Sequence, residues 1–113
     1  MPNLSKFSAI AEEVARGEGA SKVIKRINKD CALVIAEFPE DSYIIAVRQG
    51  GMTGTVVAKL VPSTKAAEVP WECRYLDYVP HGYYIIFEDQ ESFRNKLVSK
   101  LRCLRGLTRA GRT

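Results

Sequence analysis

Five short β-rich segments joined by brief connections constrain the fold of this chain most strongly. They are CALVIAEF (31–38), SYIIAVRQ (42–49), TVVAKLV (55–61), ECRYLDYV (72–79) and YYIIFED (83–89). Turn-forming sequences such as Pro39-Glu40-Asp41 and Pro80-His81-Gly82 separate them. Parallel neighbours need a crossover of about a dozen residues or more, and all of these connections are shorter. The sequence therefore predicts a mostly antiparallel sheet.

Amphipathic helices are predicted on both sides of these segments. The first helix carries apolar residues at the spacing of one helical face, namely Leu4, Phe7, Ile10, Ala11, Val14 and Ala15. Gly17-Glu18-Gly19 ends it. A second, shorter helix is predicted to begin near Ser21, with Val23, Ile24 and Ile27 facing inward. The last helix is predicted to begin at the N-cap residue Asp89, and its inner stripe is Phe93, Leu97, Leu101 and Leu104.

This order of segments predicts an α+β fold, a two-layer sandwich. It would consist of an N-terminal helix or helix pair, an antiparallel β-sheet of four to five strands, and a C-terminal helix with a basic tail. The length of 113 residues suits one domain. We predict that residues 1–106 form it and that residues 107–113 are a flexible basic tail.

Positive charge is concentrated at the C-terminal end. Residues 94–113 hold seven Lys or Arg and no Asp or Glu, whereas residues 1–93 hold 10 basic and 13 acidic side chains. A basic segment on a nearly neutral body is typical of a polyanion-binding surface. Two alternatives remain open: the solvated face of a packing helix, and a helix that lies on a membrane surface.

A second basic stretch, GEGASKVIKR (17–26), follows the first helix. It resembles the Gly-x-Gly-x-Ser-Lys stretch of double-stranded-RNA-binding domains, in which such a segment contacts phosphates. In that family the stretch follows the sheet, whereas here it precedes the sheet. A plain turn is one alternative, and a helix-turn-helix over residues 10–28 is another.

These two stretches supply the predicted nucleic-acid-binding residues. They are Lys22, Lys25, Arg26, Arg94, Lys96, Lys100, Arg102, Arg105, Arg109 and Arg112. The favoured hypothesis is a small non-enzymatic module that binds RNA or a ribonucleoprotein through phosphate contacts, with little dependence on sequence and a steep dependence on salt.

A protein-interaction module is the alternative function. Aromatic residues concentrate in residues 70–90, where Trp71, Tyr75 and Tyr83 could contact a partner. Such a module would be an inhibitor or adaptor of the kind that phages and viruses encode, and its basic end would meet an acidic protein surface. A homodimer that closes an exposed sheet edge is also compatible with the sequence.

Enzymatic, metal-binding and cofactor-binding motifs are not found in the sequence. The only histidine, His81, lies in a turn, and Cys31, Cys73 and Cys103 are widely spaced, which does not favour a metal site or a catalytic pair. We therefore expect no cofactor and no enzymatic activity. The N-terminal region lacks the apolar stretch of a signal peptide, and no run reaches the roughly 18 apolar residues of a membrane span. The expected location is cytoplasmic, with free buried thiols, although one disulfide is an alternative.

Overall fold

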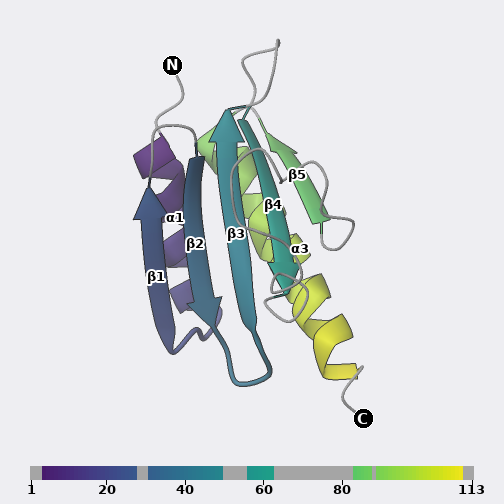
Figure 1. Cartoon of the computed structure of the whole chain (residues 1–113). Coiled ribbons are helices and arrows are strands. Elements are labelled where there is room, and N and C mark those ends of the chain that lie inside the picture. The colour runs from purple at the N-terminus through teal and green to yellow at the C-terminus, as the bar shows by residue number, and fades with distance from the viewer. Residues whose placement is uncertain (1–3, 28–30, 50–55, 63–82, 88, 111–113) are drawn as a thin grey trace.

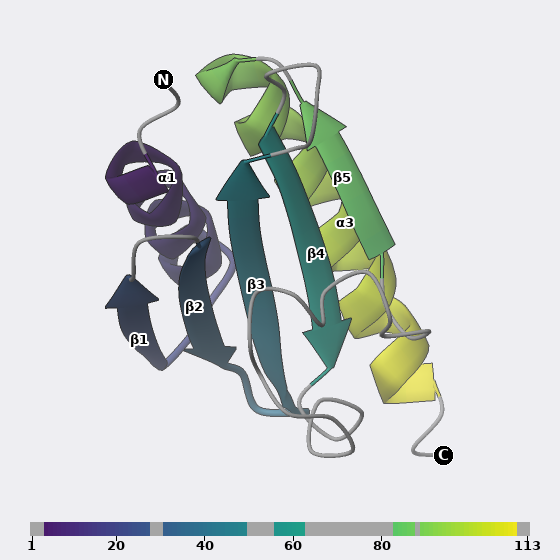
Figure 2. The ribbon, with the colours of Figure 1, turned by 45° about the horizontal axis from the view of Figure 1, so that its top comes forward.

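In the part of the chain that the structure describes, a five-stranded antiparallel sheet carries two helices on one face (Figure 1). The computed structural model describes residues 4–27, 31–49, 56–62, 83–87 and 89–110. The described elements are α1 (Leu4–Gly17), β1 (Lys22–Ile27), β2 (Cys31–Glu37), β3 (Ser42–Gln49), β4 (Val56–Pro62), β5 (Tyr83–Phe87) and α3 (Gln90–Ala110). Both helices lie behind the sheet, with α1 towards β1 and β2 and α3 towards β4 and β5 (Figure 2). The predicted two-layer α+β fold is confirmed.

The strands follow one another across the sheet in the order β1-β2-β3-β4-β5, and every neighbouring pair is antiparallel. Short connections favour this arrangement from β1 to β4, whereas residues 63–82 separate β4 from β5, so connection length does not decide the direction of that pair. In consequence β1 and β5 are the two outer strands of the described sheet. The predicted strand at residues 72–79 lies outside the described residues.

The prediction of a second helix after Ser21 is wrong. Residues Lys22–Ile27 form strand β1, which pairs with β2 from Lys22 opposite Glu37 to Ile27 opposite Ala32. Gly19, with a φ of 106°, ends α1 in the left-handed conformation that glycine adopts without strain, and the backbone N–H of Ser21 donates to the Glu37 carbonyl at 2.8 Å. The chain thus turns directly from the helix into the sheet, where β-branched residues are well accommodated.

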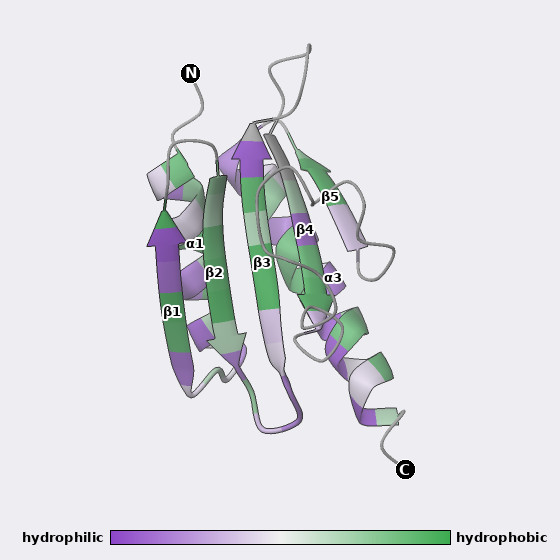
Figure 3. Cartoon of the chain, viewed as in Figure 1, coloured by the Kyte–Doolittle hydropathy of each residue, from purple (hydrophilic) through white to green (hydrophobic). Residues whose placement is uncertain are grey.

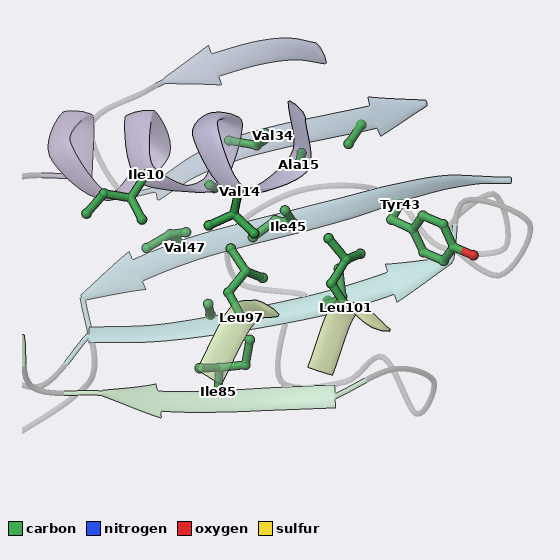
Figure 4. Close-up of a cluster of buried hydrophobic side chains, with 14 of the residues drawn as sticks. Ile10, Val14, Ala15, Val34, Tyr43, Ile45, Val47, Ile85, Leu97 and Leu101 are labelled. Carbon is green, nitrogen blue, oxygen red and sulfur yellow. The ribbon is translucent and has the colours of Figure 1, made fainter. Parts of the chain in front are cut away.

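The main core lies between the sheet and the two helices. Figure 4 shows Ile10 and Val14 of α1 and Leu97 and Leu101 of α3 converging on β3, where Ile45 and Val47 are buried. Three phenylalanines close one part of this core: the Phe87 and Phe93 ring centroids are 4.4 Å apart, and that of Phe7 lies 5.0 Å from the Phe87 centroid. The core therefore joins both ends of the chain to the sheet.

The opposite face of the sheet carries a smaller apolar cluster. Ile44 and Val61 are buried there, with Leu33 and Ile35 packed against them. The central strands are consequently apolar on both faces, which Figure 3 shows as green along β2 and the middle of β3. This explains why the sequence of β2 is a nearly continuous apolar run instead of an alternating one.

The expectation that all cysteines are free thiols is wrong for Cys31. Its side chain is buried and disulfide-bonded, whereas Cys103 on α3 is free and exposed. No signal in the spacing of three cysteines distinguishes a disulfide from free thiols, because pairing depends on which side chains the fold brings together. Among the described residues, no helix is long and apolar enough to cross a membrane.

Candidate functional site

Helix α3 carries most of the predicted binding residues, and its start follows the capping signal in the sequence. The Asp89 carboxylate accepts a hydrogen bond from the Ser92 backbone N–H at 2.7 Å. The helix continues through Gly106 to Ala110, so residues 107–110, predicted as part of a tail, are helical. Arg109 donates from Nε to the Arg105 carbonyl at 3.3 Å, and Arg112 lies outside the described residues.

Three arginines on the side of α3 that faces α1 form ion pairs with glutamates distant in sequence. Arg94 Nη2 lies 2.9 Å from Glu13 Oε2, and Arg102 Nε lies 2.6 Å from Glu18 Oε1. Arg105 pairs with Glu40. These pairs hold the pKa values of the glutamates below 4.5, mainly through the hydrogen bond that each accepts from its arginine. The positive charge of this flank is therefore balanced within the molecule.

Arg105 is the most enclosed member of this flank. Its Nε and Nη2 donate to the two Glu40 oxygens at 2.7 and 3.1 Å, and its Nη1 donates to the Glu18 carbonyl at 2.9 Å. The guanidinium also lies 4.0 Å from the centroid of the Phe38 ring. Only 13% of the Arg105 side chain and 7% of the Glu40 side chain are exposed. This geometry indicates that Arg105 anchors the helix to the turn before β3.

We expect the Arg105–Glu40 pair to make stability depend on acid pH. Because the hydrogen bond from Arg105 lowers the pKa of Glu40 from 4.5, its contribution is complete above that value and is lost as the pH falls through the lower, folded-state pKa. Urea unfolding of the wild type and of Glu40→Gln should show a gap in unfolding free energy that is large at about pH 7 and shrinks towards about pH 3. If the gap in unfolding free energy between the wild type and Glu40→Gln were the same at both pH values, the pH dependence could not be assigned to this pair.

The other flank of α3, beside strand β5, carries lysines. Lys96 donates from Nζ to the Ile86 carbonyl at 2.6 Å, and the Lys100 ammonium lies 5.2 Å from the centroid of the Tyr83 ring. Neither contact neutralises the positive charge, because the partners are a carbonyl and an aromatic face. The two lysines are four residues apart, so they lie on the same side of the helix, about 6 Å apart along its axis.

A groove of about 470 Å³ lies between this flank and β5. It is lined by Tyr84, Ile85, Ile86, Asn95, Lys96, Ser99 and Lys100. Among the described lining residues none is acidic. The side chains of Tyr84 and Ile86 point to the sheet face opposite the main core, which leaves 41% of Tyr84 and 61% of Ile86 exposed. Lys59, almost completely buried, places its ammonium 4.4 Å from the centroid of the Tyr84 ring. The Tyr84 ring therefore lies on the sheet face away from α3, whereas Lys96 and Lys100 border the groove from α3.

The structure separates the remaining predicted residues from this groove. Lys22, Lys25 and Arg26 lie on β1, at the opposite edge of the described sheet from β5. Lys25 pairs with Glu12 at 3.0 Å. The two basic stretches therefore do not form one continuous surface through the described sheet.

Of the aromatic residues predicted to bind a partner, Tyr83 is described, and it packs against the main core. Its hydroxyl lies 3.5 Å from Cys103 Sγ. Trp71 and Tyr75 lie outside the described residues. Sequence reasoning did not select Tyr84 as a binding residue, although alternation along YYIIF places Tyr84 and Ile86 together on one face. Which face is covered by the helices cannot be read from alternation alone.

The chain matches no protein-family model, and comparisons with curated proteins and with solved structures find no significant match.

Proposed function

We propose that this protein is a small non-enzymatic module that binds nucleic acid, with RNA favoured, through the lysine flank of α3. The observation that carries the proposal is the groove beside β5, where Lys96 and Lys100 lie together and no described lining residue is acidic. Lysine ammonium groups bind phosphate oxygens as point charges. The groove therefore offers two cations to a phosphate backbone, with no acidic side chain among its described lining residues.

The ion pairs of the arginine flank favour the lysines over the arginines as the residues that bind phosphate. Arg94, Arg102 and Arg105 already donate to carboxylates, so a phosphate would have to displace an internal partner at each of them. Lys96 uses one of its three ammonium donors on the Ile86 carbonyl, and the others can reach a ligand. The lysines therefore bind phosphate at a lower cost than the arginines.

Fluorescence anisotropy with a short labelled single-stranded RNA, and with DNA of the same sequence, tests the proposal. The wild type should bind at about 50 mM salt and lose affinity steeply towards about 200 mM. The double variant Lys96→Gln/Lys100→Gln should weaken binding about tenfold or more. It should also reduce the magnitude of the salt slope by about 1.4, because each phosphate contact on a single strand contributes about 0.7.

The matched control is Arg94→Gln/Arg102→Gln, which removes the same number of positive charges from the other flank of the same helix. Its RNA affinity should stay within about twofold of the wild type, because those charges are balanced by Glu13 and Glu18. Equal losses in the two double variants would overturn the assignment to the lysine flank. No binding of RNA or DNA at about 50 mM salt would overturn the proposed function itself and favour a protein partner.

A further inference from the structure

Strand β1 is an outer strand of the described sheet, at the edge opposite β5 (Figure 1). It pairs with β2 in one unbroken antiparallel register, from Lys22 opposite Glu37 to Ile27 opposite Ala32. The strand contains no proline, and its register has no bulge. In the described sheet no strand pairs with the other side of β1, so the backbone groups that point there can pair with a further strand.

The side chains of β1 alternate between the two faces of the sheet. Val23 packs against the main core and Lys25 forms an ion pair with α1, so both face the helices. Lys22, Ile24 and Arg26 therefore share the opposite face. Lys22 and Arg26 are exposed, and no ion pair among the described residues involves either of them. This face of the strand thus presents an apolar side chain between two cations.

A row of apolar side chains crosses the same face of the sheet and ends at Ile24. The register places Ile24 opposite Ile35 of β2, which lies opposite Ile44 of β3. Ile44 in turn lies opposite Val61 of β4. Val61 and Ile44 are buried, whereas Ile35 and Ile24 are half-buried. An apolar side chain on a strand added beside β1 would continue this row and cover Ile24.

Charge decides which kind of strand fits beside β1. If two copies of the chain paired antiparallel with Ile24 opposite Ile24, Lys22 of each copy would lie directly opposite Arg26 of the other. Like charges directly opposite each other destabilise a strand pair, and lysine on an outer strand is a common obstacle to self-association. A strand with acidic residues at these two places would form two favourable pairs instead.

We propose that the free edge of β1 binds an extended acidic segment of a partner protein by β-strand addition. The segment places an apolar side chain beside Ile24 and acidic side chains beside Lys22 and Arg26. Backbone hydrogen bonds supply affinity, and the two charge pairs select the acidic sequence. This edge lies across the described sheet from the groove of Lys96 and Lys100, so the site is separate from the proposed nucleic-acid surface.

Designed peptides test the proposal by fluorescence anisotropy at about 100 mM salt. The labelled peptide Thr-Glu-Val-Ile-Thr-Glu-Val carries its isoleucine and both glutamates on one face when extended. The wild type should bind it about tenfold or more tightly than Thr-Lys-Val-Ile-Thr-Lys-Val. Replacing the isoleucine of the glutamate peptide with proline retains both charges but disrupts strand pairing, and it should weaken binding by about tenfold or more.

A charge-reversed variant keeps the test independent of folding. Lys22→Glu/Arg26→Glu should bind the lysine peptide more tightly than the glutamate peptide, and a misfolded protein cannot produce this reversal. Lys96→Gln/Lys100→Gln, at the other edge, should bind the glutamate peptide within about twofold of the wild type. In NMR spectra the amide shifts caused by the glutamate peptide should concentrate on Lys22–Ile27.

The outcomes separate this inference from the proposed function. If the glutamate and lysine peptides bind equally, or the proline peptide binds as tightly as its parent, the β1 site is wrong. A wild-type dimer whose amides are protected along β1 would also overturn it, because a second copy would then occupy the edge. Loss of RNA binding in Lys96→Gln/Lys100→Gln, with peptide binding unchanged, would support both proposals.

Discussion

Replacing Arg105 with methionine should lower the free energy of unfolding by about 3 kcal/mol, the lower end of the range for breaking a buried ion pair. The variant leaves the Glu40 carboxylate in a site that is 93% enclosed, where the Tyr43 hydroxyl still donates to it at 3.1 Å. It also removes the hydrogen bond to the Glu18 carbonyl and the contact with the Phe38 ring. For a domain of this length the expected fall in melting temperature is about 10 °C. Urea unfolding measures the free energy and thermal unfolding measures the melting temperature, both followed by circular dichroism.

A double-mutant cycle identifies the cause of this loss. Arg105→Met/Glu40→Gln should recover part of the stability, because the uncompensated buried charge is removed together with its partner. Arg102→Met is the control on the same helix face: 67% of its side chain is exposed, so its loss should be below about 1 kcal/mol. Equal effects of Arg102→Met and Arg105→Met would show that enclosure is not what gives Arg105 its importance.

Replacing Phe93 with alanine should be the most damaging single change, with a loss of about 4 kcal/mol within the usual range of roughly 3–5 kcal/mol for a buried phenylalanine. Its ring is completely buried and packs on Phe87 at 4.4 Å and on Phe7 at 5.6 Å between centroids. The three rings come from α1, β5 and α3, so the cavity would loosen the helices from each other and from the sheet. Because small domains are stable by only about 5–15 kcal/mol, the variant should be close to unfolding at 25 °C.

Two control variants test whether the loss of unfolding free energy comes from the buried volume of Phe93. Phe93→Leu keeps most of the apolar volume and should lose only about 1–2 kcal/mol. Leu107→Ala, on the same helix but with 59% of the side chain exposed, should stay within about 0.5 kcal/mol of the wild type. A loss below about 1 kcal/mol for Phe93→Ala would contradict the arrangement of α3 over β5.

Ion pairs with glutamates balance the charge of three arginines on α3, which changes how the basic charge of this helix is interpreted. Seven basic residues without an acid between them suggest a single polyanion-binding surface when the sequence is taken alone. In the folded chain Glu13, Glu18 and Glu40 come from α1 and the segments that follow α1 and β2, and they meet Arg94, Arg102 and Arg105 across the helix pair. The proposed binding surface is consequently reduced to the flank that faces β5. That surface is smaller, but it lies beside a groove.

Local patterns predicted the elements whose residues suit only one structure. Phe93, Leu97, Leu101 and Leu104 form an apolar stripe along α3, and all four side chains are buried in the main core. The runs that became β2 and β3 are too closely joined to form a parallel pair, and they pair antiparallel. In β5, Tyr83 packs against the main core and Tyr84 lies on the other face, because successive side chains of a strand point to opposite faces.

The sequence by itself thus determined the two-layer α+β class, the antiparallel character of the sheet and the apolar stripe of the last helix, since these depend on periodicity and on connection length. The order of the strands, with β4 directly beside β5, came from the tertiary structure. Only the tertiary structure decided that residues 22–27 form a strand, because SKVIKRI suits either form until β2 offers it a hydrogen-bonding edge. It also decided which cations are balanced. Arg94 and Lys96 are two residues apart in sequence, yet one faces Glu13 and the other faces β5, and ion pairing depends on distance in space rather than on position in the chain.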